Sequence, residues 1–349
     1  MQGPQVKGFL SHLGVPPGLG YLSRPLRIAM VGQFTNREHW AGWLALAFQK
    51  KGHDVRAFDY REKTRTIGDM TGMNRSLVRT VRGWDSEVVV VVKGEQIQPG
   101  SLETLRKDGC RTVLLANDDH QVWREVSLPL GKHCDKVFTF TEKMLPQYKQ
   151  EGIDAEFMLF YADPSITAEW LGKNEKIYDV SFVGTYYPER EPLVKALIDS
   201  GLRFHLIGDG WESHLPLVHG DFYGGRADYD EVLKTWSQSK VCLNIHQVGL
   251  EKLGVRANLR CYELGAEGCF MFTDHVEGMR EVLGDGFFSY PDEWTAEEVV
   301  LQIRILASDK YAETRKEKAA LLHKTVLERH TAAHRASQIL QSLKLEVPA

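Results

Sequence analysis

The chain has 349 residues, of which 43% are hydrophobic and 26% are charged, and its formal net charge is −4. This length suits two domains better than one core, and the composition is that of an ordinary globular protein. No apolar run approaches the roughly 18 to 20 residues of a membrane-spanning helix, and residues 1–22 lack the pattern of a signal peptide. The five cysteines form no C-x-x-C pair, so we expect no disulfide framework and a reducing, cytoplasmic location.

Apolar runs alternate with helical periodicity along the first half of the chain. Strands are expected at residues 27–32, 54–60, 87–93, 111–116, 136–140 and 154–159, and helices at 37–51, 74–82, 101–107 and 143–150. The run EVVVVVK is apolar without alternation, which is typical of a strand covered by helices on both faces. This order predicts a parallel sheet flanked by helices.

The same alternation restarts after residue 165. Strands are expected at 179–184, 204–210, 240–245 and 269–274, helices at 189–199, 229–237 and 258–266, and helices alone over 295–343. We therefore predict an α/β protein with two Rossmann-like parallel-sheet domains, which face each other across a cleft at the carboxyl ends of the strands. The expected divisions are an N-terminal extension at 1–23, domains at 24–165 and 166–330, and a helical tail at 331–349 that crosses back to the first domain.

Polar residues follow two strands of the first domain. Gly32 lets the backbone approach a ligand at a helix start, although a plain strand-to-helix turn explains it equally well. Asp118 and Asp119 stand beside a histidine after the strand at 111–116, where an acid suits a general base, but either residue could instead cap a helix. His39 is a third candidate for a general base.

Glycine turns follow two strands of the second domain. Gly184 lies in FVGTYYPER, and Gly208 and Asp209 lie in IGDGW. Arg190 follows the first turn and supplies a cation that suits a diphosphate. Two such turns in one α/β unit indicate a ligand-binding edge of the sheet more strongly than one turn does.

The most specific segment is GVRANLRCYELGAEGCFMFTD. Arg256 and Arg260 are four residues apart and are expected on one face of a helix, with Glu263 three residues further on. Two guanidinium groups and a carboxylate at a helix start suit a nucleotide diphosphate, with arginine on phosphate and glutamate on ribose. An Arg260–Glu263 surface pair worth a few tenths of a kcal/mol is the competing interpretation.

Three other patterns carry less weight. Asp228 and Asp230 have the D-x-D form but open a helix, so capping is the favoured interpretation. His330 and His334 are four residues apart without a third ligand in view, and we predict no metal site. The chain has no G-x-G-x-x-G and no P-loop motif, which argues against a dinucleotide oxidoreductase and a P-loop kinase.

The segment NLRCYELGAEGCFMFTD resembles the N-x-R-x-F-E…A-x-G-x-F…T-D signature of the CgeB-like (spore maturation type) glycosyltransferases. DVSFVGTYYPER, IGDGW and KVCLNIH extend the likeness over roughly residues 179–292. The resemblance implies the GT-B fold with a glycosyltransferase group 1-like C-terminal domain. It implies metal-independent transfer of a sugar from a nucleotide diphosphate-sugar, with UDP favoured and no further cofactor. Together with Gly32, it places the donor against Gly184, Arg190, Gly208, Asp209, Trp211, Gly225, His246, Arg256, Asn258, Arg260, Glu263 and Gly268.

One position departs from the pattern of the wider group. A second glutamate often stands eight residues before the one that matches Glu263, and here that position is Val255. Retention or inversion of configuration therefore stays open. A nucleotide-sugar epimerase of the same architecture and a non-catalytic nucleotide-sugar-binding protein are the alternative functions.

The acceptor is not identified by any motif. A basic stretch, which is usually a solvated face, would also attract an acidic or phosphate-bearing acceptor such as modified nucleic acid or a surface polymer. The stretch consists of Arg61, Lys63, Arg65, Arg75, Arg79 and Arg82.

Overall fold

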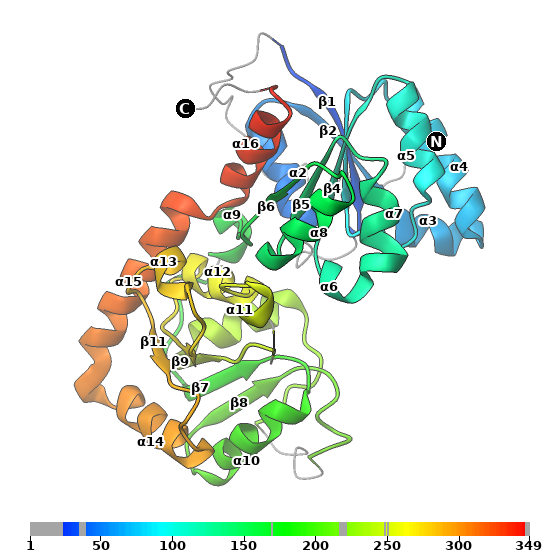
Figure 1. Ribbon diagram of the computed structural model, residues 1–349. Coiled ribbons are helices and arrows are strands. Elements are labelled where there is room, and N and C mark those ends of the chain that lie inside the picture. The colour runs from blue at the N-terminus through cyan, green and yellow to red at the C-terminus, as the bar shows by residue number, and fades with distance from the viewer. Residues whose placement is uncertain are drawn as a thin grey trace. The chain divides into compact units, whose positions relative to one another are not determined.

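The computed structural model describes residues 24–34, 40–168, 170–215, 222–247, 249 and 251–345. The chain forms two compact units (Figure 1). The first unit comprises Met1–Leu159 together with Ala332–Ala349, and the second comprises Phe160–Thr331. Within the described ranges no helix has both the length and the apolar character needed to cross a bilayer.

The first unit is built on a six-stranded sheet of order β2-β1-β3-β4-β5-β6, in which every pair is parallel. Its strands are β1 (Arg27–Gly32), β2 (Asp54–Asp59), β3 (Val88–Val92), β4 (Arg111–Ala116), β5 (Lys136–Thr139) and β6 (Ala155–Phe157). All five residues of β3 are buried valines, because this central strand is covered on both faces. The predicted strands of this half are thus confirmed, with shorter ends.

Helices cover both faces of this sheet. The helices are α2 (Trp40–Lys50), α3 (Tyr60–Ile67), α4 (Met70–Gly83), α5 (Pro99–Lys107), α8 (Leu145–Gln150) and α16 (Ala332–Ser342). One core joins the sheet to α4, α5 and α8, while α2 packs against β1 and β2 and is itself covered by α16. The last helix belongs to this unit because Arg335 Nε donates to the Leu159 carbonyl at 2.8 Å and Gln338 donates to the Phe157 carbonyl at 3.1 Å.

Two details of the first half differ from the expectation. Tyr60 begins α3 instead of ending a strand, because the Asp59 carboxylate accepts the Glu62 amide and caps the helix at that point. After β4 the chain forms α6 (Asp119–Val122), a π-helical turn at Trp123–Ser127 and α7 (Leu128–Gly131). These short elements lack a clear apolar period, so the sequence pattern did not predict them.

The second unit has a five-stranded sheet of order β11-β10-β9-β7-β8, again parallel throughout. Its strands are β7 (Tyr178–Val183), β8 (Phe204–Ile207), β9 (Ser239–Asn244), β10 (Met271–Asp274) and β11 (Phe288–Tyr290). The sequence did not predict β11, which has three residues. Because all the strands run the same way, residues 184, 208, 245 and 275 follow strand ends at one edge.

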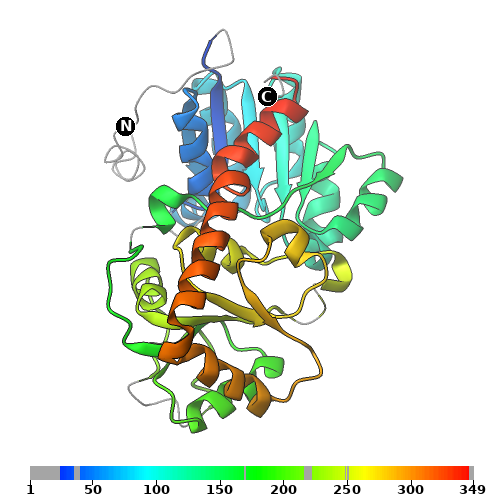
Figure 2. The ribbon, with the colours of Figure 1, turned by 90° about the vertical axis from the view of Figure 1, so that its left-hand side faces the viewer.

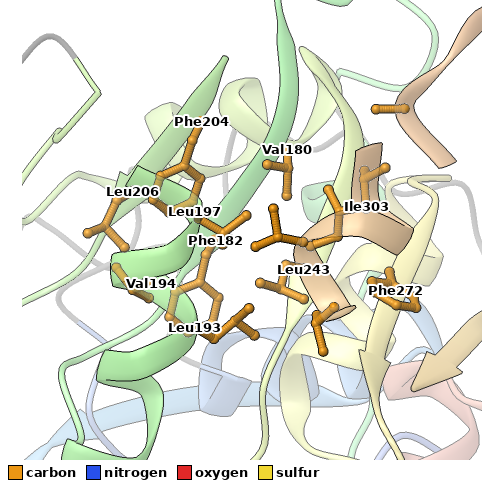
Figure 3. Packing of buried hydrophobic residues seen from close by; sticks show 14 of the residues in the cluster. Val180, Phe182, Leu193, Val194, Leu197, Phe204, Leu206, Leu243, Phe272 and Ile303 are labelled. Atoms are coloured by element: carbon orange, nitrogen blue, oxygen red, sulfur yellow. The ribbon is translucent and has the colours of Figure 1, made fainter. Parts of the chain in front are cut away.

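The core of the second unit lies between this sheet and two helices, α10 (Glu191–Asp199) and α14 (Ala296–Ala307) (Figure 3). Phe182 and Leu243 come from the sheet and meet Leu197 and Ile303 from the helices. Fully burying such side chains contributes about 1.5–3 kcal/mol each. This packing fixes the strand ends from which the candidate site is built.

The remaining described helices of this unit are α9 (Pro164–Thr167), α11 (Tyr229–Ser237), α12 (Leu259–Ala266), α13 (Met279–Leu283) and α15 (Ala312–Arg329). The long helix α15, orange in Figure 2, packs against α12. A Cβ on Gly265 would lie 2.5 Å from Val326 Cγ2, so a glycine is required where these helices meet. Residues 295–343 contain only helices, as predicted.

Candidate functional site

Two glycine turns lie against each other at the carboxyl ends of β7 and β8. Gly208 has φ +150°, and a Cβ at this position would lie 2.0 Å from the Gly184 carbonyl oxygen. The Gly208 amide donates to the Gly225 carbonyl at 2.9 Å, and Gly225 has φ +62°. Gly184 and Gly208 therefore form a close backbone contact that a side chain on Gly208 would disrupt, while Gly225 takes a left-handed conformation that favours glycine.

Trp211 packs against these turns. Its side chain is fully buried, its Nε1 donates to the Gly184 carbonyl at 2.8 Å, and its ring contacts Phe182 and Tyr186 edge-on. Because its ring has no exposed face, Trp211 acts on these turns through its contacts with them, and its nearness to the nucleotide base stays a prediction. Asp209 is half exposed and pairs with Arg226 at 3.6 Å.

Arg190 joins the ends of β7 and β9. Its guanidinium donates to the Thr185 carbonyl at 2.8 Å and to the Ile245 carbonyl at 2.7 Å, and it lies 4.8 Å from the centre of the Tyr187 ring. The residue is only 6% exposed, and Nε has no partner among the described residues. Burial lowers the pKa of Arg190 to about 10, and repulsion from Arg260 acts in the same direction.

Helix α12 begins at the same edge, after β9. Asn258 is its N-cap, and its Oδ1 accepts the Cys261 amide at 3.3 Å. Arg256 lies before the cap in a loop and pairs with Glu281 at 3.0 Å. The expectation that Arg256 and Arg260 share a helix face is therefore wrong, because the helix starts only at Leu259.

Arg260 lies in the first turn of α12. Its side chain is half-buried, and burial lowers the pKa of its guanidinium, although Glu263 acts in the opposite direction. The Glu263 carboxylate accepts the Tyr229 hydroxyl at 2.8 Å. No Arg260–Glu263 salt bridge forms, and Arg260 Nε is buried without a hydrogen-bond partner in the described part of the chain. The guanidinium groups of Arg190 and Arg260 thus repel each other. Arg260 stands in the first turn of α12, where the backbone amides have no partner within the helix.

His246 follows β9, and Asp274 is the last residue of β10. His246 Nδ1 lies 2.7 Å from Asp274 Oδ1, and the Asn258 amide donates to Nε2 at 3.2 Å. Burial lowers the pKa of His246, whereas the hydrogen bonds with Asp274 and Cys261 raise it. The Asn258 amide acts against this rise, because it bonds only to a ring whose Nε2 carries no proton. Sequence analysis assigned no role to Asp274, although it ends a predicted strand.

Several residues singled out from the sequence lie elsewhere. Gly268 has φ +67° beyond the C-terminal end of α12, where a Cβ would lie 2.3 Å from Leu171 Cδ1. It therefore packs against the turn at Leu171, away from the Asn258 end of the helix. Asp228 caps α11 by accepting the Glu231 amide at 2.9 Å, as the capping interpretation predicted. No cluster of three or more potential metal ligands occurs among the residues that the structure describes.

The candidate residues of the first unit differ in exposure. Asp118, with φ +57°, is exposed and pairs with Lys93 at 3.1 Å, and its side chain does not cap α6. Asp119 is fully buried and accepts the hydroxyls of Thr139 at 2.5 Å and Tyr148 at 3.1 Å. Burial raises the pKa of Asp119 against the effect of these bonds. Gly32 lies close to α2, because a Cβ would be 3.2 Å from Ala41 Cβ. His39 lies outside the described residues.

The second unit's edge brings together several groups that favour anions. Arginine N–H groups and the free amides of α12 supply positive potential, and the buried glycine turns allow a ligand to approach the backbone. A phosphate-bearing ligand would satisfy the donors that the protein leaves unpaired, whereas a cation would meet repulsion.

Residues 190–341 match the family described as "Glycosyl transferase-like". No curated protein matches the chain. A sucrose-phosphate synthase from Thermosynechococcus elongatus is similar in structure, with a TM-score of 0.61 and 11% identity over 91% of this chain and 99% of that chain. A glycosyltransferase from Rickettsia africae ESF-5 has a TM-score of 0.60 and 10% identity over 92% and 98% of the respective chains.

A UDP-GlcNAc 2-epimerase from Neisseria meningitidis, whose structure holds UDP-GlcNAc, also matches with a TM-score of 0.56. Its identity is 11%, and the match covers 91% of this chain and 99% of that chain. At these identities the likeness shows the fold alone. The chain therefore has the GT-B fold of two parallel-sheet α/β domains, and its C-terminal part is glycosyltransferase-like.

Proposed function

We propose that this protein is a glycosyltransferase that takes a sugar from a nucleotide diphosphate-sugar, with UDP as the favoured nucleotide. The observation that carries the proposal is the pair Arg190 and Arg260, whose guanidinium groups repel each other and whose buried Nε atoms have no hydrogen-bond partner among the described residues. The glycosyltransferase-like match over 190–341 contains both residues. The motifs at 179–292 favour the CgeB-like group within this fold.

The position of this charge suits the reaction. When the bond between the sugar and the diphosphate breaks, negative charge grows on the leaving phosphate oxygens. Arginine donors and helix amides placed there stabilise the transition state more than the ground state. Glu263 is buried and accepts from Tyr229 at 2.8 Å, so it is fixed in orientation and suits a ribose hydroxyl.

For acceptor activation, we favour Asp118 over Asp119, the other described candidate from the sequence. It is the exposed member of the acid pair, whereas Asp119 is enclosed by Thr139 and Tyr148. General-base catalysis contributes roughly 10²- to 10⁴-fold. If Asp118 is this base, Asp118→Asn lowers kcat by about 100-fold or more and leaves the Kd for UDP unchanged. An unchanged kcat contradicts the assignment.

A thermal-shift screen tests the proposed ligand class. Uridine, UMP, UDP and UDP-sugars form a series in which only the phosphate and sugar parts change. Because a ligand at 100 times its Kd stabilises by about 2.7 kcal/mol, UDP and a UDP-sugar should raise Tm, while uridine at the same concentration should not. Equal shifts with uridine and UDP contradict a diphosphate site, and a parallel series with guanine and thymine nucleotides identifies the base.

Product analysis then separates transfer from the alternatives. The donor that gives the largest shift is incubated alone and with a panel of hydroxyl-bearing acceptors, including acidic polymers. A new glycoside formed together with free nucleotide diphosphate supports the transferase. Epimerised nucleotide-sugar without an acceptor identifies an epimerase, and tight binding without any product identifies a binding protein.

A further inference from the structure

His246 lies at one strand end and contacts two other elements. It follows β9, is 4% exposed, and its Nδ1 lies 2.7 Å from Asp274 Oδ1 at the end of β10. The backbone amide of His246 donates to the same carboxylate at 3.1 and 3.0 Å, and Thr273 Oγ1 donates to it at 2.9 Å. Asp274 is thus held as an acceptor, which requires a proton on His246 Nδ1.

The other ring nitrogen contacts the start of α12. His246 Nε2 accepts the backbone amide of Asn258 at 3.2 Å. In a capping box, the side chain of a glutamate or glutamine at the third helical position accepts the N-cap amide. In α12 that position is Cys261, so the ring of His246 takes the place of the missing acceptor.

A second contact joins Asn258 to the same strands. Asn258 Nδ2 donates to Asn244 Oδ1 at 3.1 Å, and Asn244 Nδ2 donates to Thr273 Oγ1 at 3.1 Å. The N-cap of α12 is therefore bonded directly to the end of β9 and, through Asn244, to the end of β10. Arg260 stands two residues beyond this cap, so the direction of its side chain depends on how the cap is held.

We propose that His246 is a positioning residue for the nucleotide diphosphate: with its proton held on Nδ1 by Asp274, its Nε2 lone pair anchors the Asn258 amide and orients the first turn of α12. This inference rests on the proposed function for the identity of the ligand. It replaces the expectation that His246 contacts the donor directly. A ring that carried a proton on Nε2 would point an N–H at the Asn258 N–H and could not anchor it.

Two substitutions of His246, together with one of Asp274, distinguish the roles of the two ring nitrogens. In His246→Gln the side-chain oxygen can reach the place of Nε2, which restores an acceptor for Asn258. In His246→Asn the shorter amide can reach only the place of Nδ1, so it keeps a donor for Asp274 and removes the acceptor. Asp274→Asn supplies a donor to Nδ1 and drives the proton to Nε2, which also removes the acceptor.

Calorimetry with UDP measures the consequence. We expect His246→Asn and Asp274→Asn to weaken UDP binding about tenfold, the effect of losing one buried hydrogen bond, and His246→Gln to stay within about threefold of wild type. Equal losses in the Gln and Asn variants overturn the proposal. Thermal unfolding of each variant shows that it is folded, so a loss of affinity is not a loss of structure.

NMR of the free protein tests the anchoring without any ligand. The ¹⁵N shifts of His246 should show a neutral ring protonated on Nδ1 at neutral pH, and the Asn258 amide should exchange slowly in wild type and His246→Gln but quickly in His246→Asn. An imidazolium or an Nε2–H ring overturns the proposal. If wild type binds no UDP but shows the expected tautomer and exchange, the proposed function fails while the anchoring stands.

Discussion

The two sheets of this protein have the same parallel architecture but differ in how the charged side chains at their carboxyl edges are paired. At the first edge, Lys93 pairs with Asp118 at 3.1 Å, and Glu95 accepts from both Tyr60 and Arg61. At the second edge, the guanidinium groups of Arg190 and Arg260 repel each other, and each has a buried Nε without a partner among the described residues.

This difference shows which feature identifies a ligand site in such a fold. Turns after parallel strands occur at both edges, so a turn alone does not indicate a ligand. A buried arginine donor without a hydrogen-bond partner is costly, and a bound ligand can supply the missing acceptor. The unpaired arginine donors of the second edge are therefore the basis on which we propose the diphosphate site there.

The largest expected effect concerns the backbone of the second edge. In Gly208→Ala the new Cβ meets the Gly184 carbonyl oxygen at 2.0 Å, and the residue keeps φ +150°, so we expect the free energy of unfolding to fall by about 3 kcal/mol or more. Gly201→Ala is the matched control: its φ is +72° but nothing lies within 4 Å, so it costs only about 1 kcal/mol. Urea unfolding followed by tryptophan fluorescence measures both. Equal costs would show that the Gly184–Gly208 contact is not required.

The buried carboxyl group of Asp119 in the first unit should make the free energy of unfolding depend on pH. Burial raises the folded-state pKa of Asp119, so its contribution to stability is fully present below the unfolded pKa of about 3.9 and is lost as pH rises through the folded pKa. Relative to Asp119→Asn, wild type should therefore lose about 1.4 kcal/mol for each unit by which the folded pKa exceeds the unfolded one. Urea unfolding of both proteins between pH 4 and 8 measures this difference. A difference that grows in favour of wild type with rising pH contradicts the assignment.

The smallest effect is expected at the exposed ion pair of the first edge. Lys93→Ala removes the partner of Asp118, and because both side chains are more than 40% exposed, the free energy of unfolding should change by only about 0.2–1 kcal/mol. UDP affinity should change less than twofold, since this pair takes no part in the anion site. A tenfold loss of UDP affinity in calorimetry would show that the Lys93–Asp118 pair contributes to UDP binding. It would contradict the distinction between the two edges.

The sequence predicted the two parallel α/β units well, because continuous apolar runs and helical periodicity alternate clearly in RIAMVG, EVVVVVK and KVCLNI. It did not predict the turns that begin α6 or the short strand β11, since these elements have too few residues for a period to be visible. It also extended one strand through Tyr60, where a carboxylate cap starts a helix.

The candidate site was predicted in part. The segment after Gly254 does place Arg260 and Glu263 on α12 beside a strand edge, but spacing alone could not show that Arg256 precedes the N-cap and pairs with Glu281. The sequence also could not show that the Trp211 ring is fully buried against the glycine turns, because burial depends on the tertiary structure. The His246–Asp274 contact joins residues 28 positions apart, and only the neighbouring positions of β9 and β10 bring them together.

The central claim is that Arg260 binds a diphosphate, and calorimetry with UDP on Arg260→Ala and Arg256→Ala tests it most directly. The two arginines are four residues apart, but only Arg256 has a carboxylate partner within the described structure. We predict that Arg260→Ala weakens UDP binding by roughly 1.5–3 kcal/mol, the contribution of a charge-assisted hydrogen bond, while Arg256→Ala changes it by less than about 1 kcal/mol. Unchanged UDP affinity in folded Arg260→Ala would contradict the account.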